Sequence, residues 1–558
     1  MIFRRLHRLV GGHRIMLTMV LCLFALYVAS SVDGKKGKAA PQTDERIYLD
    51  HSDELWYDMY GPVPDARIVK GNVHFIHKGA HLWCDSAYFY QESNSVEAFG
   101  HVRFKQGDTL SLTCDRADYD GQSQLMRSRF NVVLKHRKQI LYTDSLDYDR
   151  LYSFAYFFEG GKLVDGNDQL VSDWGEYNTG TREAVFRFNV KLRSGKDVIT
   201  TDTLYYDTRQ SLAHVTGPSK VESDSSTIFT ENAFFNTKTD QAELYGRSKV
   251  VNGMKTIVAD SLYHDSGTGR NEGFGNVVYI DTENRNELNC GHLFYNDSTG
   301  YGYATHRALM KDFSQNDTLY MHADSIKIYT FNIDTDSAYR KVHAFRKVRA
   351  FRNDVQAVCD SLVFNSQDSC MTMYKDPIVW NANKQLLGET IKAYMNDSTV
   401  RLVNVIEHAL SVEQVDNENH YNQISSKYMD AYFTDGVMRK AVSTGNVKCI
   451  NYNIDKKDST VSELIYLETD TMRMFLSERR QLERIWTSKA RSTIYPVTQI
   501  PPEKYKLPTF AWFDGVRPKD KDDVFVWRGK GEGNELKSVE RHEAPLQHLK
   551  PALQPREE

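Results

Sequence analysis

The chain has 558 residues, of which 41% are hydrophobic and 26% charged, and its 70 basic and 74 acidic residues give a formal net charge of −4. This composition excludes a disordered chain. The near balance of charge also lacks the one-signed field that attracts nucleic acid, so we expect no nucleic-acid partner.

Residues 1–32 have the layout of an export signal. Four arginines (Arg4, Arg5, Arg8 and Arg14) precede an apolar run at residues 15–32. Small residues favour cleavage after Ser31, but the run is also long enough for an uncleaved inner-membrane anchor, and both interpretations stay open. We expect residues 33–44 to be a linker.

The central part of the chain is almost free of proline. Only Pro218 and Pro377 lie between residues 65 and 495, whereas eight of the 13 prolines follow residue 495. Because proline cannot donate a backbone hydrogen bond, this scarcity predicts nearly uninterrupted regular structure. The 32 tyrosines and 27 phenylalanines favour β-sheet, and no stretch shows a helical period.

One motif recurs thirteen times between residues 45 and 495. An acidic residue marks most copies, and the first seven markers are 29 or 30 residues apart. We call this position the marker; the thirteen markers are Asp85, Asp115, Asp144, Asp173, Asp202, Glu231, Asp260, Gly291, Asp324, Asp360, Glu389, Lys427 and Asp470. About fourteen residues upstream of each marker, glycine or asparagine before a β-branched residue opens a second predicted strand.

The motif predicts strands that bend. Apolar or small residues occupy positions −3, −1, +2 and +4 relative to the marker, and the change of parity between −1 and +2 indicates a bulge or corner. The fold class is therefore all-β: a solenoid-like stack of about 26 bent strands in 13 two-strand repeats. Its length would be about 125 Å if every strand adds a rung, or about 60 Å if each repeat adds one rung to each face.

The inward positions enclose a long apolar interior, which packs as a core and would accept acyl chains if it stays open. The candidate lipid-binding residues are the large members of these columns: Leu82, Phe89, Leu112, Tyr119, Leu141, Leu146, Tyr148, Leu170, Tyr177, Ile199, Leu204, Tyr206, Ile228, Phe235, Ile257, Leu262, Leu288, Leu293, Tyr295, Ile326, Leu362 and Phe364.

Catalytic chemistry is not indicated. A carboxylate repeated at every rung is typical of a structural device that accepts hydrogen bonds at a corner, so we predict no catalytic residue. The cysteines lack metal-ligand spacing, and we expect neither a metal nor a cofactor. Cys84 and Cys114 occupy position −1 in consecutive repeats, which leaves a disulfide between them open.

The repeat frame resembles the OstA-like family, the periplasmic lipopolysaccharide-transport proteins related to LptA and to the N-terminal domain of LptD. The clearest copies are residues 71–90, 100–119, 246–265 and 275–296. The resemblance implies a twisted, V-shaped β-jellyroll that holds lipid A acyl chains inside and joins similar modules end to end. Its length and N-terminus resemble the long family members of Bacteroidota-type bacteria.

This resemblance implies a non-enzymatic bridge that carries lipopolysaccharide from the inner to the outer membrane. The expected partners are lipopolysaccharide, other β-jellyroll transport proteins at the terminal strands (residues 47–60 and 485–495), and the inner membrane through the N-terminal segment. The expected location is the periplasm. The repeats would form one unit or two consecutive modules, at about 45–270 and 271–495.

Two other classes of protein stay open as alternatives, and the C-terminal residues differ in composition from the repeats. A β-solenoid adhesin or scaffold, or a right-handed β-helix enzyme acting on polysaccharide, would also show repeats of this length. Residues 496–558 are rich in proline, lysine and glutamate, which predicts a flexible tail. Residues 510–513 and 524–527 are aromatic enough to serve as short docking elements within it.

Overall fold

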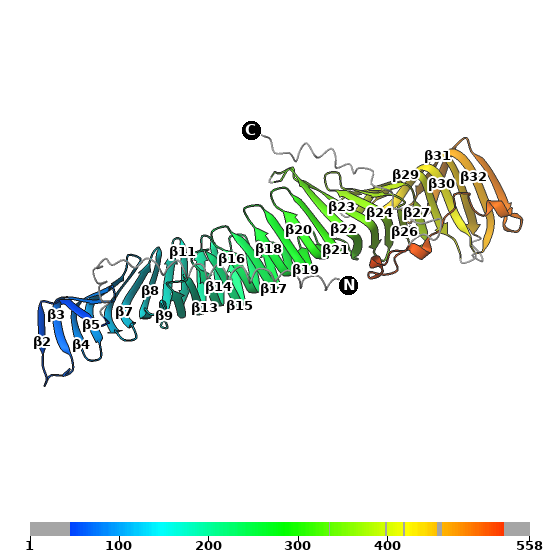
Figure 1. Cartoon of the computed structure of the whole chain (residues 1–558). Helices are drawn as coiled ribbons and strands as arrows, with labels where there is room; N and C mark the ends of the chain where they lie inside the picture. Colours follow the sequence, from blue (N-terminus) through cyan, green and yellow to red (C-terminus); the bar gives the residue numbers. More distant parts are fainter. Residues whose placement is uncertain (1–44, 334, 397–398, 417–418, 455–459, 529–558) are drawn as a thin grey trace, which may run out of the picture.

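The structure is a computed structural model that describes residues 45–333, 335–396, 399–416, 419–454 and 460–528. The predicted signal or anchor at residues 1–32 and the linker at 33–44 lie outside the described residues. The described chain forms an elongated, twisted stack of strands (Figure 1). Its helical content is four short 3-10 helices near the C-terminal end, and the predicted all-β class is confirmed.

All 34 strands belong to one sheet, and every pairing is antiparallel. Parallel pairing between successive coils defines a right-handed β-helix, so the structure argues against that alternative. The strands of the first half are β1 (Tyr48–His51), β2 (Glu54–Tyr57), β3 (Arg67–His77), β4 (Ala80–Tyr90), β5 (Ser95–Gln106), β6 (Leu110–Asp120), β7 (Leu125–His136), β8 (Gln139–Asp149), β9 (Phe154–Phe157), β10 (Gly161–Asp165), β11 (Asp168–Ser172), β12 (Trp174–Asn178), β13 (Glu183–Ser194), β14 (Asp197–Asp207), β15 (Leu212–Glu222), β16 (Ser226–Asn236) and β17 (Gln241–Asn252).

The second half continues the same ladder without a break near residue 270, because β18 and β19 pair along their whole length. Its strands are β18 (Lys255–Asp265), β19 (Arg270–Asp281), β20 (Asn286–Asn296), β21 (Tyr301–Asp312), β22 (Leu319–Phe331), β23 (Tyr339–Phe351), β24 (Val355–Asn365), β25 (Cys370–Tyr374), β26 (Ile378–Asn381), β27 (Lys384–Leu387), β28 (Thr390–Asn396), β29 (Thr399–Gln414), β30 (Tyr421–Thr434), β31 (Val437–Ile454), β32 (Val461–Leu476), β33 (Leu482–Ser488) and β34 (Arg491–Pro496).

The strand count differs from the predicted 26 for two reasons. Six pairs of consecutive short strands, such as β9 with β10, pair with the same neighbour and share one rung, so the 34 strands form 28 rungs. Thirteen marker strands and thirteen upstream strands account for 26 of these, as predicted. One further rung closes each end: β1 with β2, and β33 with β34. The 28 rungs follow one another along a single axis, which corresponds to about 130 Å at a spacing of about 4.8 Å.

Each long strand has a corner at its middle. In β4, for example, the register shifts between Trp83 and Ser86, on either side of the marker Asp85, so the predicted bulge is present. The glycine–asparagine signal also lies at a corner: Gly100 and His101 sit in the middle of β5 with φ of 73° and 43°. The prediction that this signal opens the upstream strand is therefore wrong. A two-residue left-handed bulge needs residues that tolerate positive φ, wherever in the strand it falls.

The corners fold the sheet so that its two halves face each other. We call the half of each marker strand that precedes the marker, together with the parts of the upstream strands that pair with it, the first arm. The half that follows the marker, with the parts that pair with it, is the second arm. The mouth is the side opposite the corners, where the free edges of the two arms meet. Phe75 of the first arm and Phe89 of the second arm pack with ring centroids 5.3 Å apart. The main core cluster lies between the arms. The fold is thus one bent sheet closed on its own inner face.

Residues 497–528, which we call the strap, are packed against the sheet. They contain the 3-10 helices η1 (Val497–Gln499), η2 (Pro502–Lys504), η3 (Asp514–Val516) and η4 (Asp523–Phe525), and they pack on the outer face of the first arm between β22 and β32. The predicted flexible tail is wrong for these residues, because their aromatic side chains bury apolar surface on the sheet. Residues 529–558 lie outside the described residues.

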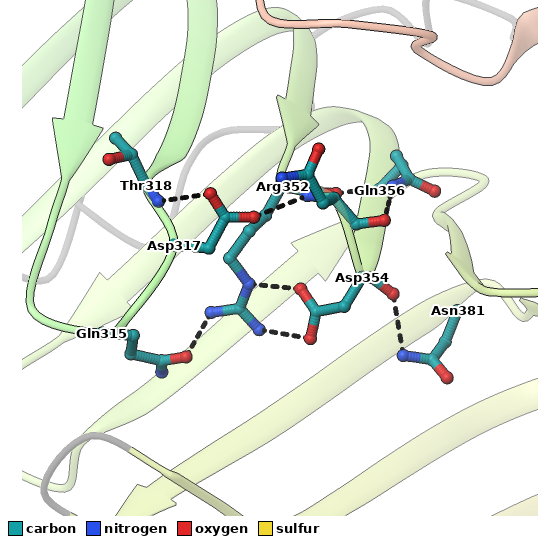
Figure 2. Close-up of polar contacts among 8 residues, drawn as sticks. Gln315, Asp317, Thr318, Arg352, Asp354, Gln356 and Asn381 are labelled. Carbon is teal, nitrogen blue, oxygen red and sulfur yellow. Dashed lines mark hydrogen bonds and ion pairs between the residues drawn. The ribbon is translucent and has the colours of Figure 1, made fainter.

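The loops beside the strap are tied together at the edge of the first arm (Figure 2). The Arg352 guanidinium donates to both carboxylate oxygens of Asp354 and to Gln315. Asp317 accepts from the backbone N–H of Asn353 at 3.1 Å. These bonds join the β21–β22 turn to the β23–β24 turn.

Candidate functional site

The inner face of the sheet is formed by the predicted columns. Positions −1 and +2 lie next to the corner and are buried in nearly every repeat, whereas positions −3 and +4 lie toward the mouth. The exposure of these outer two positions therefore reports whether the mouth is closed.

The mouth is closed from β3 to β15, which we call the sealed segment. Here both outer positions are buried in each of the first five repeats. The buried residues at −3 and +4 are Leu82, Phe89, Leu112, Tyr119, Leu141, Tyr148, Leu170, Tyr177, Ile199 and Tyr206. The two arms pack against each other as an ordinary protein core in this segment.

Tyrosines at position +4 close the mouth with hydrogen bonds across it. Tyr119 Oη lies 2.6 Å from His77 Nδ1, and Tyr148 Oη donates to Gln106 Oε1 at 3.3 Å. Each partner is the last residue of an upstream strand, on the opposite edge. Burial raises the pKa of both tyrosines, so they remain neutral hydroxyl groups.

The next two repeats use the same arrangement. Tyr177 Oη lies 2.8 Å from His136 Nδ1, and Tyr206 Oη donates to Asp168 Oδ2 at 3.2 Å. Burial lowers the pKa of His136, which favours its neutral form. We call this row of four tyrosines and their partners the seam.

Arg150 is the central residue of the seam. Its guanidinium donates to Tyr119 Oη at 2.5 Å, to Gln106 Oε1 at 3.2 Å, and to the carbonyl oxygens of His77 and Lys78 at 3.4 Å. Arg150 belongs to the turn after β8, on the second arm, and all its acceptors except Tyr119 lie on the first. One buried side chain therefore ties the two edges together.

The seam ends after Tyr206, and from β16 to β32 the mouth is open; we call this part the open segment. With the single exception of Met321, every residue at −3 and +4 is partly exposed here. These partly exposed residues are Ile228, Phe235, Ile257, His264, Leu288, Tyr295, Ile328, Ala357, Phe364, Leu386, Ala393, Ile424, Ala431, Leu467 and Met474. The inner face here is an apolar wall accessible from the mouth.

The 22 candidate residues predicted from the sequence thus divide into two groups. Those of the sealed segment, including Leu146 and Leu204, are fully buried, and so are Leu262, Ile326 and Leu362 near the corner of the open segment. Seven are partly exposed on the open wall: Ile228, Phe235, Ile257, Leu288, Leu293, Tyr295 and Phe364. The assignment of columns from the sequence did not separate these two groups. The residue type at +4 could have separated them, because four consecutive tyrosines precede Phe235.

The markers are structural in the repeats where their contacts are seen. Asn131, Asn189 and Asn276 at the corners of upstream strands donate to marker carboxylates at 2.6–2.8 Å. The donor follows the marker by 16 residues in each case, so the bond joins neighbouring rungs. These pairs lie on the outer surface and hold the corners in register.

Cys84 and Cys114 are free, buried thiols. They lie on β4 and β6 with β5 between them, which places them about 9–10 Å apart, too far for a disulfide. Burial raises the pKa of the Cys84 thiol to about 12 and that of Cys114 to about 11, so neither is a reactive thiolate at neutral pH.

The described residues contain no group of three or more histidine, cysteine, aspartate or glutamate side chains placed to hold a metal ion. No helix in the described ranges has the length and apolar character of a membrane span.

An elongated antiparallel sheet bent around an apolar interior, with one side open, defines a class of repeat proteins built to enclose a long apolar surface. The family model described as OstA-like protein matches residues 44–202. The chain therefore carries an OstA-like segment, and the predicted resemblance is confirmed for it. The matched stretch nearly coincides with the sealed segment.

Comparison with solved structures gave a match to LptH, the LptA homologous periplasmic component of the conserved lipopolysaccharide transport device from Pseudomonas aeruginosa. It is 10% identical with a TM-score of 0.15, and the match covers 27% of this chain and 81% of that one. No curated protein matches the sequence.

Proposed function

We propose that the protein is a non-enzymatic periplasmic carrier of lipopolysaccharide, whose acyl chains bind on the inner wall of the open segment. The observation that carries this proposal is the change at β16, beyond which every residue at −3 and +4 except Met321 is partly exposed as far as β32, and most of these residues are apolar. A continuous exposed apolar surface is rare in soluble proteins unless it binds something.

The energetics favour acyl chains as the occupant. Each methylene transferred from water to an apolar surface contributes about 0.8 kcal/mol, so a chain of a dozen carbons gains several kcal/mol even when only half of it is covered. The open segment spans fifteen rungs, about 70 Å, which is a long groove rather than a pocket for a small molecule. The OstA-like segment supports lipopolysaccharide over other lipids.

The end rungs support docking between carriers. Among the described residues β1 and β2 pair only with β3, and β33 and β34 pair only with β32, so within this part of the chain each end presents a strand edge without a neighbour. Such edges can extend into the sheet of a neighbouring protein. We propose that other β-jellyroll transport proteins bind there, and that residues 1–32 direct the protein to the periplasm or anchor it to the inner membrane.

Photo-crosslinking in cells tests the lipid site. A crosslinking amino acid at Phe235 or Leu293, on the open wall, should capture lipopolysaccharide. The matched controls are Tyr148, which faces inward in the sealed segment, and Tyr263, which faces outward on β18 next to Leu262. Equal capture at Phe235 and Tyr263, or none at either open position, would contradict the proposal.

A further inference from the structure

The strap covers the outside of the wall whose inside is the proposed lipid site. In the sealed segment the opposite arm covers the whole inner face of each arm, but in the open segment the part of the first arm's inner face toward the mouth is left partly exposed. From β22 to β32 the strap supplies a packing partner on the outer face instead. Trp380, Ile378 and Val412 are fully buried beneath it, in a cluster separate from the main core.

Three buried glutamines of the sheet bind the strap. Gln385 on β27 donates to the Ala511 carbonyl oxygen and accepts from the Phe513 N–H, both at 2.8 Å. Gln423 on β30 does the same with Tyr505 and Leu507, at 3.0 and 2.8 Å. Each amide thus pairs with a carbonyl and an N–H two residues apart, as a neighbouring strand would.

The third glutamine extends this attachment along the sheet. Gln356 on β24 accepts from Arg517 Nε at 2.7 Å, and Arg517 also donates to the Ala382 carbonyl oxygen. Strands β24, β27 and β30 lie along successive parts of the stack (Figure 1). The glutamine bonds therefore fix the strap at three separated places.

The far end of the strap contacts β22 and β23. Asp523 accepts from the Arg528 guanidinium and lies 3.8 Å from Arg349 on β23, which is only 1% exposed. Phe525 packs against His322 of β22 with ring centroids 4.8 Å apart. The strap is therefore fixed from β32 back to β22.

Strap contacts and groove contacts alternate along the same strands. Gln385 and Leu387 face the strap while Leu386, between them, faces the groove, and Gln423 adjoins the groove residue Ile424. The wall is a single layer of sheet here, so any shift of a strand that changes its contacts with the strap also moves the side chains that face the groove. Binding events on two faces of one element are coupled whenever each favours the same position of that element.

We propose that the strap is a positioning element for the groove: its attachment to the outer face fixes the first arm where the inner face can bind acyl chains. This inference rests on the proposed function. The coupling is reciprocal: lipid bound in the groove should stabilise the attachment of the strap by the same factor by which the attached strap increases lipid affinity.

The test uses the full chain with Gln385→Ala and Gln423→Ala together. The matched control is Gln241→Ala, which removes a glutamine bonded to Asp265 on the second arm, away from the strap. Binding of fluorescently labelled lipopolysaccharide should weaken about fivefold or more in the double variant, the lower end of typical coupling, and not in the control. Hydrogen exchange should rise in residues 505–517 and in β26–β30 but not in β3–β8, which shows that the fold persists.

Two results would overturn the inference. One is release of residues 505–517, seen by hydrogen exchange, with unchanged lipopolysaccharide affinity. The other is release of the strap with unchanged exchange in β26–β30, a readout that needs no lipid. If the unaltered protein itself binds no lipopolysaccharide, the proposed function fails, and the exchange of β26–β30 alone decides whether the strap positions the wall.

Discussion

Replacing Arg150 by alanine should open the mouth of the sealed segment. Arg150 joins Tyr119 of the second arm to Gln106, His77 and Lys78 of the first, and it is only 7% exposed. The substitution removes every one of these bonds and leaves Tyr119 with His77 as its remaining partner across the mouth. The apolar contacts behind the seam are retained, so the sheet itself should stay folded.

The magnitude follows from the two shorter bonds, to Tyr119 Oη and Gln106 Oε1. Hydrogen bonds from a charged donor contribute about 1.5–3 kcal/mol each, and water at the newly opened edge replaces part of that, so the free energy of local opening should fall by about 3 kcal/mol. A factor of ten corresponds to about 1.4 kcal/mol, which makes the expected increase in the open population about 100-fold.

A thiol at an outer position reports this opening, because residues at −1 such as Cys359 stay buried even where the mouth is open. Leu112, at −3 in the sealed segment, is fully buried, so Leu112→Cys places a thiol behind the seam, and the natural Cys359 serves as the internal reference. When reclosing is fast, the alkylation rate of a buried thiol follows the open population. Site-resolved mass spectrometry should therefore show about 100-fold faster alkylation of the Leu112→Cys thiol when Arg150→Ala is also present, with Cys359 unchanged.

A matched arginine provides the control. Arg129 forms a 2.8 Å ion pair with Asp147 on the outer face and is partly exposed, so Arg129→Ala should change the free energy of opening by no more than about 1 kcal/mol. If the Leu112→Cys thiol reacts at the same rate with and without Arg150→Ala, the seam does not hold the mouth closed and the reasoning is wrong.

Two further predictions concern stability. Gly100 has φ of 73°, and a Cβ there would lie 2.4 Å from Asp85 Oδ2, so Gly100→Ala should destabilise β4 and β5 by about 2 kcal/mol, measured by hydrogen exchange. Gly79 has nearly the same φ but open space around it, so Gly79→Ala should cost about 1 kcal/mol. Equal costs would exclude the Asp85 contact as a cause. Burial lowers the pKa of His343 to about 4, below its unfolded value near 6.5. Below pH 6.5 the unfolded chain binds a proton at this residue that the folded protein does not. The free energy of unfolding should therefore be highest above pH 6.5 and fall by up to about 3 kcal/mol as the pH drops toward 4. In denaturation series at several pH values, His343→Gln should remove this part of the pH dependence, and an unchanged slope would show that His343 is not its source.

The repeat architecture was predictable because it depends on local pattern. Alternation by two with a parity change at the marker requires a bent strand, and the same residues that satisfy this pattern, such as Leu82 and Phe89, are buried in the structure. The position of the corner signal in the upstream strand was not predictable in the same way. A glycine–asparagine pair tolerates positive φ at a strand start as readily as at a bulge, and only strand pairing distinguishes the two.

The strap shows where sequence pattern was insufficient. Proline and charge in residues 496–558 are typical of a flexible tail, but Trp512 and Phe513 find an apolar outer face that no single repeat reveals. Burial of a short irregular segment depends on what lies opposite it, and that surface is assembled from five strands distant in the chain.

By itself, the sequence determined the all-β stack, its thirteen repeats, the inward columns and the structural role of the markers, because each depends on residues within about thirty positions of one another. Only the tertiary structure decided where the interior is sealed and where it is open. That outcome depends on contacts across the mouth between residues about forty positions apart, such as His77 with Tyr119. Among the described residues beyond Tyr206, no tyrosine at +4 forms such a contact across the mouth. The same apolar columns form a groove there instead of a core.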